Sequence, residues 1–222
     1  SVKIAQKVGE EKYKLFLSKL GITGGINFDI EEVGVPVKFN WGKCPLATAS
    51  FGHGITTTLL QIVKAYSIVV NGGFDVNPVL IKPKQKNKRK KIFNEEVSSK
   101  ILPILRKIVA TKNGTAKLAN VAGYEIGGKT GTANKSIKGV YANKKINTFV
   151  SVFPISSPKF ILAVMLDEPE INEDYIYEYR DGSNFKLKGS PRNTAGWNSV
   201  EVTGHIVEKI GPILATKYSE AN

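Results

Sequence analysis

The chain has 222 residues, of which 41% are hydrophobic and 23% charged, a composition typical of a folded globular protein that excludes a disordered or fibrous chain. No apolar run approaches the roughly 18 to 20 residues that a membrane-spanning helix requires. The formal net charge is +13, but only four of the 32 basic residues are Arg. Proteins that bind a specific nucleic-acid sequence favour Arg for bidentate contacts. The low share of Arg therefore indicates a diffuse attraction to anions and no specific nucleic-acid partner.

The residues that commonly bind metals are too few for a metal centre. Cys44 is the only cysteine, so no internal disulfide can form, and His53 and His205 are the only histidines. We therefore expect no metal site and no cofactor. A thiol enzyme built on Cys44 and His53 is a weak alternative, because such pairs are recognised in space and not by proximity in sequence. The chain starts with Ser1-Val-Lys-Ile-Ala, without an initiator Met, and we expect it to belong to a longer or processed protein.

Apolar residues at helical spacing predict two helices in the first part of the chain. The first extends from Ile4 to Leu20, with an irregularity near Gly9. Residues Gly21 to Pro45 are rich in Gly and Pro and poorly periodic, which predicts an extended connection. A buried helix is then expected from Leu59 to Val70, because Thr residues that can cap it precede it and Gly72-Gly73 follows it.

A strongly basic segment separates this helix from the next one. Residues Lys82 to Lys91, KPKQKNKRKK, contain seven basic residues and no apolar side chain. We interpret them as a solvated loop; a patch for anions or a targeting signal is the alternative. Helical spacing returns from Glu95 to Ala110 with Pro103 as an irregularity, and Asn113-Gly114 predicts a turn.

After Ala122 the spacing of apolar residues becomes typical of strands. Apolar and polar residues alternate from Tyr124 and Ile126 towards Lys129, and they alternate again over residues 148–153. Residues 160–166 form a continuous apolar run. The short Pro/Ser connection PISSPK between the last two predicts an antiparallel hairpin. Residues 167–196 are polar and irregular. A final helix is expected from Val200 to Lys217 with a bend at Pro212.

One stretch, GYEIGGKTGTA, matches two motifs with different chemistry. Residues 123–130 satisfy the phosphate-binding pattern G-x-x-x-x-G-K-[ST], and the acidic end of FILAVMLDE at 160–168 is similar to a Mg²⁺-binding strand. A phosphate loop requires a helix after its Lys-Thr pair, but residues 131–145 are rich in Gly and Asn. The predicted hairpin also implies antiparallel strands, whereas the nucleotide fold needs parallel ones. A P-loop ATPase is therefore disfavoured.

The other motif is the K-T-G triplet formed by Lys129, Thr130 and Gly131. On a strand, Lys129 and Thr130 face opposite sides, while Thr130 and Thr132 share one side. Two hydroxyl groups beside an ammonium group suit a carboxylate, and Gly131 allows a ligand backbone to approach closely. The backbone N–H of Thr132 could also bind a developing oxyanion.

Several sequence blocks, in this order, resemble the C-terminal part of the transpeptidase domain of a class B penicillin-binding protein of the division type. They are Ser50-Phe-Gly-His-Gly54 followed by Thr58-Leu-Leu-Gln61, Asn113-Gly-Thr-Ala116, Gly127-Gly-Lys-Thr-Gly-Thr-Ala133, Asp167-Glu-Pro169 and Thr194-Ala-Gly-Trp197. The resemblance implies an α/β (α+β) fold with an antiparallel sheet flanked by helices, similar to serine β-lactamases and incomplete at its N-terminal side. Residues 1–222 would be part of a single transpeptidase domain.

The resemblance also implies roles for the K-T-G strand. Lys129 would supply a positive charge in catalysis, and Thr132 would offer its backbone N–H to the oxyanion. Lys129, Thr130, Gly131 and Thr132 together would bind the carboxylate of D-Ala-D-Ala or of a β-lactam. The family nucleophile is the serine of an S-x-x-K motif, supported by an S-x-N motif.

Those two upstream motifs are not found where the family has them. No S-x-N occurs in the chain, and both S-x-x-K matches, Ser156 to Lys159 and Ser183 to Lys186, follow the K-T-G triplet. We interpret them as chance matches, and the same holds for Glu168 to Asn172, which imitates a β-lactamase motif. We therefore expect the nucleophile to lie upstream of Ser1 and this fragment alone to be inactive.

The function expected from the resemblance is that of a peptidoglycan D,D-transpeptidase fragment. Its partners would be stem peptides, β-lactams and proteins of a division or elongation complex. The parent protein would act at the periplasmic face of the bacterial inner membrane, with its anchor outside this chain. The alternatives are a D,D-carboxypeptidase, a β-lactamase, a β-lactam sensor, a catalytically inactive scaffold module or a basic module that binds nucleic acid or anionic lipid.

Overall fold

The computed structural model describes residues 1–222 except 31–33, 35, 83–88, 138–139, 190–191 and 220–222. The chain divides into two compact units, Ser1–Ser98 and Ser99–Asn222. Six residues of the basic segment 82–91 lie outside the described residues, so its predicted loop structure stays a prediction for that part. The assignment of residues 1–222 to a single domain likewise stays a prediction.

The first unit begins with two short helices where the sequence predicts one. Helix α1 covers Val2–Val8 and α2 covers Glu10–Lys19. The prediction of one helix from Ile4 to Leu20 was wrong, because Gly9 has a φ of 84° and interrupts the helical backbone. Helix α3, Lys43–Ala49, packs against α1. The predicted extended connection therefore ends before Pro45, which lies inside α3.

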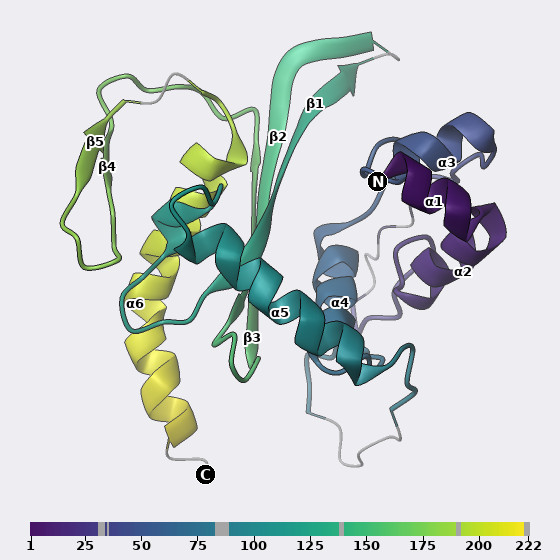
Figure 1. The fold of residues 1–222 in the computed structure, drawn as a ribbon, viewed down its shortest axis with the longest axis horizontal. Helices are drawn as coiled ribbons and strands as arrows, with labels where there is room; N and C mark the ends of the chain where they lie inside the picture. The colour runs from purple at the N-terminus through teal and green to yellow at the C-terminus, as the bar shows by residue number, and fades with distance from the viewer. Residues whose placement is uncertain (31–33, 35, 83–88, 138–139, 190–191, 220–222) are drawn as a thin grey trace. The chain divides into compact units, whose positions relative to one another are not determined.

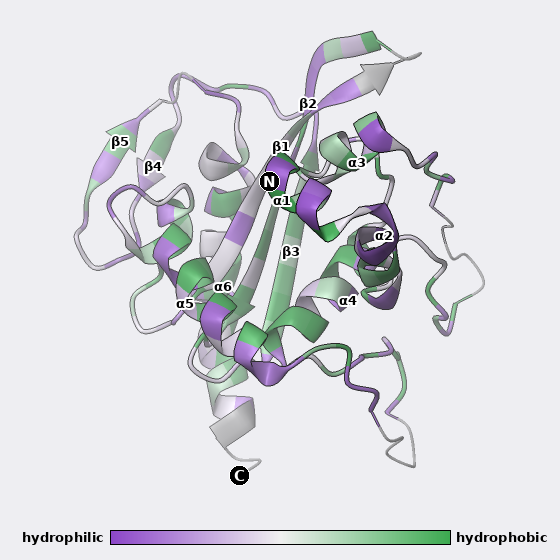
Figure 2. Ribbon diagram, turned by 45° about the vertical axis from the view of Figure 1, so that its right-hand side comes forward, coloured by the Kyte–Doolittle hydropathy of each residue, from purple (hydrophilic) through white to green (hydrophobic). Residues whose placement is uncertain are grey.

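Helix α4, Leu59–Val70, has the predicted bounds and lies at the core of the first unit. Thr58 accepts a hydrogen bond from the backbone N–H of Gln61, and the Gln61 side chain accepts one from the backbone N–H of Thr58. Gln61 is 1% exposed, and its Nε2 also donates to the carbonyl oxygen of Gly21 at 3.1 Å. The ribbon of α4 is mainly hydrophobic, and Ala65 and Ile68 are buried in the core (Figure 2). The cap and the buried amide together fix where this helix starts.

A three-stranded antiparallel sheet forms the centre of the second unit (Figure 1). Its strands are β1 (Gly127–Ile137), β2 (Val140–Phe153) and β3 (Phe160–Asp167), and their order in the sheet is β1-β2-β3. The hairpin predicted between β2 and β3 is confirmed by the pairing of Phe153 with Phe160. Strands β1 and β2 are longer than predicted. Residues 131–134 of β1 and Val140 and Tyr141 of β2 are exposed, and these distal parts lack the apolar alternation that predicts a strand from sequence.

Two helices pack against this sheet. Helix α5, Glu95–Ala110, has the predicted bounds and contains Pro103, and its residues Leu105 and Arg106 lie against Gly127 of β1. Helix α6, Ser199–Ser219, contains Pro212 and contacts β2 and β3. The buried core that joins these elements includes Val109, Ile126, Phe149, Phe153, Val200 and Val207. The predicted class, an antiparallel sheet flanked by helices, is confirmed.

The segment 167–196 has more structure than its polar sequence predicts. A small antiparallel hairpin joins β4 (Ile176–Glu178) to β5 (Lys186–Lys188), and a 3-10 helix, η2, covers Ala195–Trp197. A second 3-10 helix, η1, covers Lys117–Ala119. Tyr177 anchors the hairpin because it is buried and its ring meets that of Trp197 edge to face at 5.2 Å. None of the helices in the described part of the chain combines the length and apolar character that a bilayer crossing requires.

Candidate functional site

The K-T-G triplet lies near the start of β1, which is an edge strand of the sheet in the described chain. Lys129 pairs with Val150 and Thr132 pairs with Asn147 of β2. Residues 127–137 form one continuous strand, so no helix follows the Lys-Thr pair. This agrees with the sequence-based prediction against a phosphate loop, because a strand cannot present a helix N-terminus to a phosphate.

The glycines around the triplet have two different functions in this strand. A Cβ atom on Gly128 would lie 2.6 Å from the Val150 carbonyl oxygen and 2.6 Å from the Phe149 ring, so no larger residue fits there. On Gly131 the nearest atom to such a Cβ would be the Thr148 carbonyl oxygen, at 3.8 Å. Gly128 therefore lets β1 pack closely onto β2, whereas Gly131 leaves open surface in front of the strand.

Four threonines, three of which form the hydrogen bonds described here, line one cavity of about 410 Å³. Thr130 and Thr132 line it from β1, and Thr115 lines it from the loop before η1. The Oγ1 atoms of Thr115 and Thr130 are 3.1 Å apart, and Thr132 Oγ1 accepts a hydrogen bond from the backbone N–H of Ala195 at 3.0 Å. The structure thus places Thr130 and Thr132 on one side of β1, as the strand geometry predicts.

Lys129 is not among the residues that line this cavity. Its side chain is exposed, and Nζ donates a hydrogen bond to the carbonyl oxygen of Thr130 at 2.7 Å. The ammonium group therefore stays close to the K-T-G backbone while the two hydroxyl groups face the cavity. This agrees with the expectation that Lys129 and Thr130 face opposite sides of the strand.

Further residues complete the cavity, and sequence reasoning gave them no role. They are Gly114, Lys117, Leu118, Tyr179, Arg192, Thr194, Gly196 and Trp197. Two of the sequence blocks that carry the family resemblance, Asn113 to Ala116 and Thr194 to Trp197, contribute residues to this cavity. No sequence motif indicates Lys117, Tyr179 or Arg192, because the fold brings them together from distant segments. Burial raises the pKa of Tyr179, so its hydroxyl stays protonated at neutral pH and can donate a hydrogen bond.

A network of amide side chains holds the segment that contains Arg192 and Thr194. Asn193 Oδ1 accepts hydrogen bonds from Asn147 Nδ2 at 2.8 Å and from Asn198 Nδ2 at 3.2 Å. The Asn193 carbonyl oxygen accepts another from Lys145 Nζ at 3.0 Å. Since Asn147 is fully buried in β2, this wall of the cavity is attached to the sheet.

A buried ion pair supports the opposite wall. Arg180 follows the cavity residue Tyr179 and forms two hydrogen bonds to the carboxylate of Glu201 in α6, at 3.0 and 3.1 Å. Arg180 Nη1 also donates to the carbonyl oxygen of Leu118 in η1 at 3.4 Å. Burial alone would lower the pKa of Arg180, but the hydrogen bonds and charges of Glu201 and Glu208 outweigh it and raise that pKa. One charged group thus connects β4, η1 and α6 behind the cavity.

Comparison with known proteins identifies the family. Residues 1–184 match the family described as the penicillin-binding protein transpeptidase domain. The chain belongs to this family. The probable peptidoglycan D,D-transpeptidase FtsI of Caulobacter vibrioides is 26% identical over 96% of this chain. Stage V sporulation protein D of Bacillus subtilis is 31% identical over 76% of it.

The transpeptidase relatives are longer proteins. The two alignments cover 36% and 28% of those relatives, so the chain spans about a third of their length. Among solved structures, the transpeptidase domain of penicillin-binding protein 3 from Burkholderia pseudomallei superposes with a TM-score of 0.77. That match is 23% identical and covers 96% of this chain and 60% of the other, and it supports the shared fold.

The S-x-x-K matches of this chain lie outside helices. Ser156 and Lys159 lie in the turn between β2 and β3, and Ser183 and Lys186 lie in the β4–β5 hairpin. Hydrogen bonds from the side chain and backbone of Ser156 lower the pKa of Glu125, so this serine interacts with a carboxylate. The structure supports the interpretation of both matches as chance, because neither places Ser and Lys one turn apart at a helix start. Glu168, the first residue of the segment that imitates a β-lactamase motif, forms ion pairs with Lys135 of β1 and Lys144 of β2.

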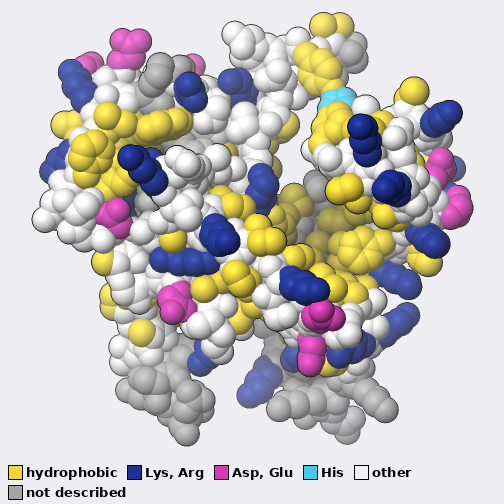
Figure 3. All heavy atoms as spheres, in the orientation of Figure 1, with side chains coloured by type: hydrophobic (Ala, Val, Ile, Leu, Met, Phe, Trp, Pro, Cys, Tyr) yellow, Lys and Arg dark blue, Asp and Glu magenta, His cyan; other side chains and the backbone are white. Residues whose placement is uncertain are grey.

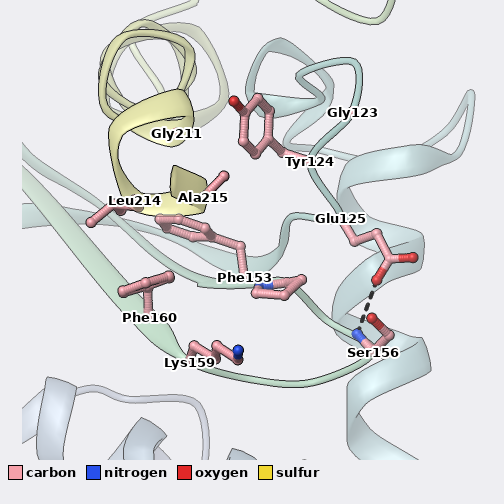
Figure 4. Close-up of a pocket in the computed structure, with 11 residues that line it drawn as sticks. Gly123, Tyr124, Glu125, Phe153, Ser156, Lys159, Phe160, Gly211, Leu214 and Ala215 are labelled. Atoms are coloured by element: carbon pink, nitrogen blue, oxygen red, sulfur yellow. Dashed lines mark hydrogen bonds between the residues drawn. The ribbon is translucent and has the colours of Figure 1, made fainter. Parts of the chain in front are cut away.

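A second cavity, of about 470 Å³, contains none of the K-T-G residues (Figure 4). Phe153 and Phe160 line it from the sheet, Leu214 lines it from α6, and the Tyr124 ring stands beside Gly211 (Figure 4). Ser156 donates its backbone N–H to Glu125 Oε2 at 3.1 Å at the edge of this cavity. The lining of this cavity is mainly apolar. Among the described residues there is also no group of three or more His, Cys, Asp or Glu side chains that could hold a metal ion.

Proposed function

We propose that this chain forms the carboxylate-binding part of a peptidoglycan D,D-transpeptidase. In this proposal the K-T-G strand binds the terminal carboxylate of a D-Ala-D-Ala stem peptide and the equivalent carboxylate of a β-lactam. The observation that carries it is the placement of the Thr130 and Thr132 hydroxyl groups on one cavity wall, in a chain of the transpeptidase family. Gly131 lies between them and leaves room for a ligand backbone.

The hydrogen bonds of the two threonines support this assignment. Thr132 Oγ1 already accepts the N–H of Ala195, so its own proton is available for a carboxylate oxygen. Thr115 can donate to Thr130 Oγ1 across 3.1 Å, which directs the Thr130 proton into the cavity in the same way. A carboxylate has two oxygens and accepts both bonds. The Lys129 ammonium adds a positive charge next to the same strand, and the Thr132 backbone N–H is assigned to the oxyanion.

The nucleophile in this proposal is a serine in an S-x-x-K motif upstream of Ser1. It attacks the carbonyl carbon between the two D-Ala residues, the terminal D-Ala leaves as an amine, and an acyl ester forms. An amine from a second stem peptide then attacks the ester and releases the serine. The parent protein would carry out this reaction at the periplasmic face of the bacterial inner membrane, together with proteins of a division or elongation complex.

The test is covalent labelling of the full-length parent protein with a fluorescent penicillin. We expect one adduct, which peptide mapping by mass spectrometry places on a serine upstream of Ser1. The isolated 222-residue chain should give no adduct under the same conditions. An adduct on Ser156 or Ser183, or no adduct on the parent at saturating label, would contradict the proposal.

A further inference from the structure

Asn147 is a buried amide whose hydrogen bonds are only partly satisfied. It lies in β2 opposite Thr132 of the K-T-G strand and is fully buried. Its Nδ2 donates a hydrogen bond to Asn193 Oδ1 at 2.8 Å, but its Oδ1 accepts none from the described residues. A buried acceptor without a donor destabilises a folded protein. The stability of the sheet therefore does not explain this residue, whereas its bond to Asn193 offers an explanation.

Asn193 leads directly into the segment that contacts the K-T-G strand. Two residues later, the backbone N–H of Ala195 donates to Thr132 Oγ1 at 3.0 Å. Of the residues that donate hydrogen bonds to Asn193, Asn147 alone is fully buried, so it is the anchor inside the sheet. The position of the Ala195 N–H thus depends on a side chain in the interior of β2.

The same segment also supports the second threonine of the site. A Cβ atom on Gly196 would lie 2.6 Å from the Thr115 carbonyl oxygen, so η2 packs closely against the loop that contains Thr115. The Oγ1 atoms of Thr115 and Thr130 are 3.1 Å apart. Residues 193–196 are therefore connected to both hydroxyl groups, to Thr132 directly and to Thr130 through Thr115.

We propose that Asn147 is a positioning residue for carboxylate binding at the K-T-G strand. Acting through Asn193, it holds the Ala195 N–H against Thr132 before a ligand arrives, so that the Thr132 proton is already directed into the cavity. A ligand then does not have to order these groups when it binds, which increases its affinity. This inference rests on the proposed function and extends its site to a residue that does not line the cavity.

A purely structural role for Asn147 is the competing explanation, and Ser151 provides a matched control for it. Ser151 is also fully buried in β2, and it lies four residues further along the strand on the same face. Its Oγ donates to the carbonyl oxygen of Leu162 in β3 at 3.0 Å. Because β3 pairs with the side of β2 that is remote from the K-T-G strand, this bond has no connection to residues 193–196.

The substitutions that test the proposal do not change the charge of the chain. Figure 3 shows Lys and Arg side chains scattered over the visible face, and the net charge of +13 attracts any carboxylate ligand to some degree. Replacement of Asn147, Asn193 or Ser151 by Ala leaves this diffuse attraction unchanged, because all three side chains are neutral. Differences in affinity among the variants therefore report on local structure.

The experiment measures three quantities in the unchanged chain, in Asn147→Ala and in Ser151→Ala. They are the midpoint of urea denaturation, the hydrogen-exchange rate of the Ala195 amide and the dissociation constant of acetyl-D-Ala-D-Ala, the last two by nuclear magnetic resonance. We expect Asn147→Ala to increase the exchange rate about tenfold and to weaken binding about three- to tenfold, with little change in the midpoint. Ser151→Ala should lower the midpoint and leave the other two quantities unchanged.

Asn193→Ala tests whether Asn147 acts through Asn193. It should weaken binding at least as much as Asn147→Ala does. The double variant should bind no more weakly than Asn193→Ala alone, because the two residues share one connection to Ala195. If Asn147→Ala does not fold, Asn193→Ala still decides the question, because Asn193 is only half-buried and its loss should also speed exchange at Ala195.

The outcomes separate this inference from the proposed function. Unchanged affinity and Ala195 exchange in Asn147→Ala or in Asn193→Ala, or additive losses of affinity in the double variant, would overturn the inference and leave the proposed function intact. Parallel losses of midpoint and affinity in Asn147→Ala and Ser151→Ala would do the same, because they would show a purely structural role. Failure of the unchanged chain to bind acetyl-D-Ala-D-Ala at Thr130 and Thr132 would overturn both.

Discussion

The backbone N–H of Ala195 donates a hydrogen bond to the side-chain hydroxyl of Thr132 at 3.0 Å, and this bond links β1 to the 3-10 helix η2. It has two consequences for the site. It orients the Thr132 hydroxyl so that its proton is free for a ligand, and it fixes the position of Thr194 and Trp197 next to the strand. The site therefore depends on contacts between segments that are 63 residues apart in sequence.

Replacement of Thr132 tests this relationship. Thr132→Val keeps the side-chain shape but leaves the Ala195 N–H without its acceptor and the ligand without a donor. We expect affinity for acetyl-D-Ala-D-Ala to fall by about tenfold, equivalent to roughly 1.4 kcal/mol. Titration calorimetry measures the change, and Thr132→Ser should retain most of the affinity because it keeps the hydroxyl. Equal affinity in the Val variant and the unchanged chain would contradict the assignment.

The two glycines of the K-T-G region should respond differently to the same substitution. Gly128→Ala places a Cβ against the Val150 carbonyl oxygen, so we expect the free energy of unfolding to fall by about 1 to 3 kcal/mol. Gly131→Ala meets no atom closer than 3.8 Å and should change it by less than about 0.5 kcal/mol while weakening ligand binding. Urea denaturation measures both variants. Similar destabilisation by the two would show that the packing at Gly128 has no special role.

The buried pair of Arg180 and Glu201 should be important for the stability of the second unit. Arg180→Met leaves the buried carboxylate of Glu201 with only the Tyr175 hydroxyl and His205 as polar partners, and we expect the free energy of unfolding to fall by about 3 to 5 kcal/mol. The double variant with Glu201→Met should lose less than the sum of the two single variants, because no charge remains unpaired. As a control, Lys186→Met removes an exposed pair with Glu178 and should have no measurable effect. A small effect of Arg180→Met would mean that this pair does not hold η1 and α6 together.

Tyr66 gives the first unit a stability that depends on pH. Burial in α4 raises its pKa to about 12, from 10.0 in the unfolded chain. Because the folded state favours the neutral phenol, this contribution is complete below pH 10 and is lost as the pH rises towards 12. The loss should amount to about 2 kcal/mol relative to Tyr66→Phe, which has no ionisable hydroxyl. Denaturation series over this pH range in both proteins measure the difference. Parallel curves would contradict the burial of Tyr66.

Much of the fold was predictable because its signals are local. Helix α4 is defined by the capping pair Thr58 and Gln61 at its start and by the two glycines that follow Val70. The β2–β3 hairpin is defined by its short Pro/Ser turn. The strand geometry of Thr130 and Thr132 also follows from side-chain alternation alone. These features depend on residues close in sequence.

The remaining features depend on contacts that the sequence does not show. Tyr177 is buried against Trp197, and this contact stabilises strands of only three residues that have no periodic pattern of their own. Lys117 and Arg192 share a cavity because Thr115 and Ala195, which lie close to them in sequence, both form hydrogen bonds to threonines of β1. The sequence predicts an irregularity at Gly9, but whether a glycine bends or ends a helix depends on a backbone angle that composition does not determine.

The rate of acylation of the full-length parent protein by a labelled penicillin tests the central claim most directly. We predict a covalent adduct in the unchanged protein and a rate about a hundredfold lower in Lys129→Gln, because the charge beside the K-T-G strand is lost. Lys107→Gln removes the same charge from an exposed position on α5 and should react at the unchanged rate. Equal rates in Lys129→Gln and the unchanged protein would contradict the role of the K-T-G strand in binding and reaction.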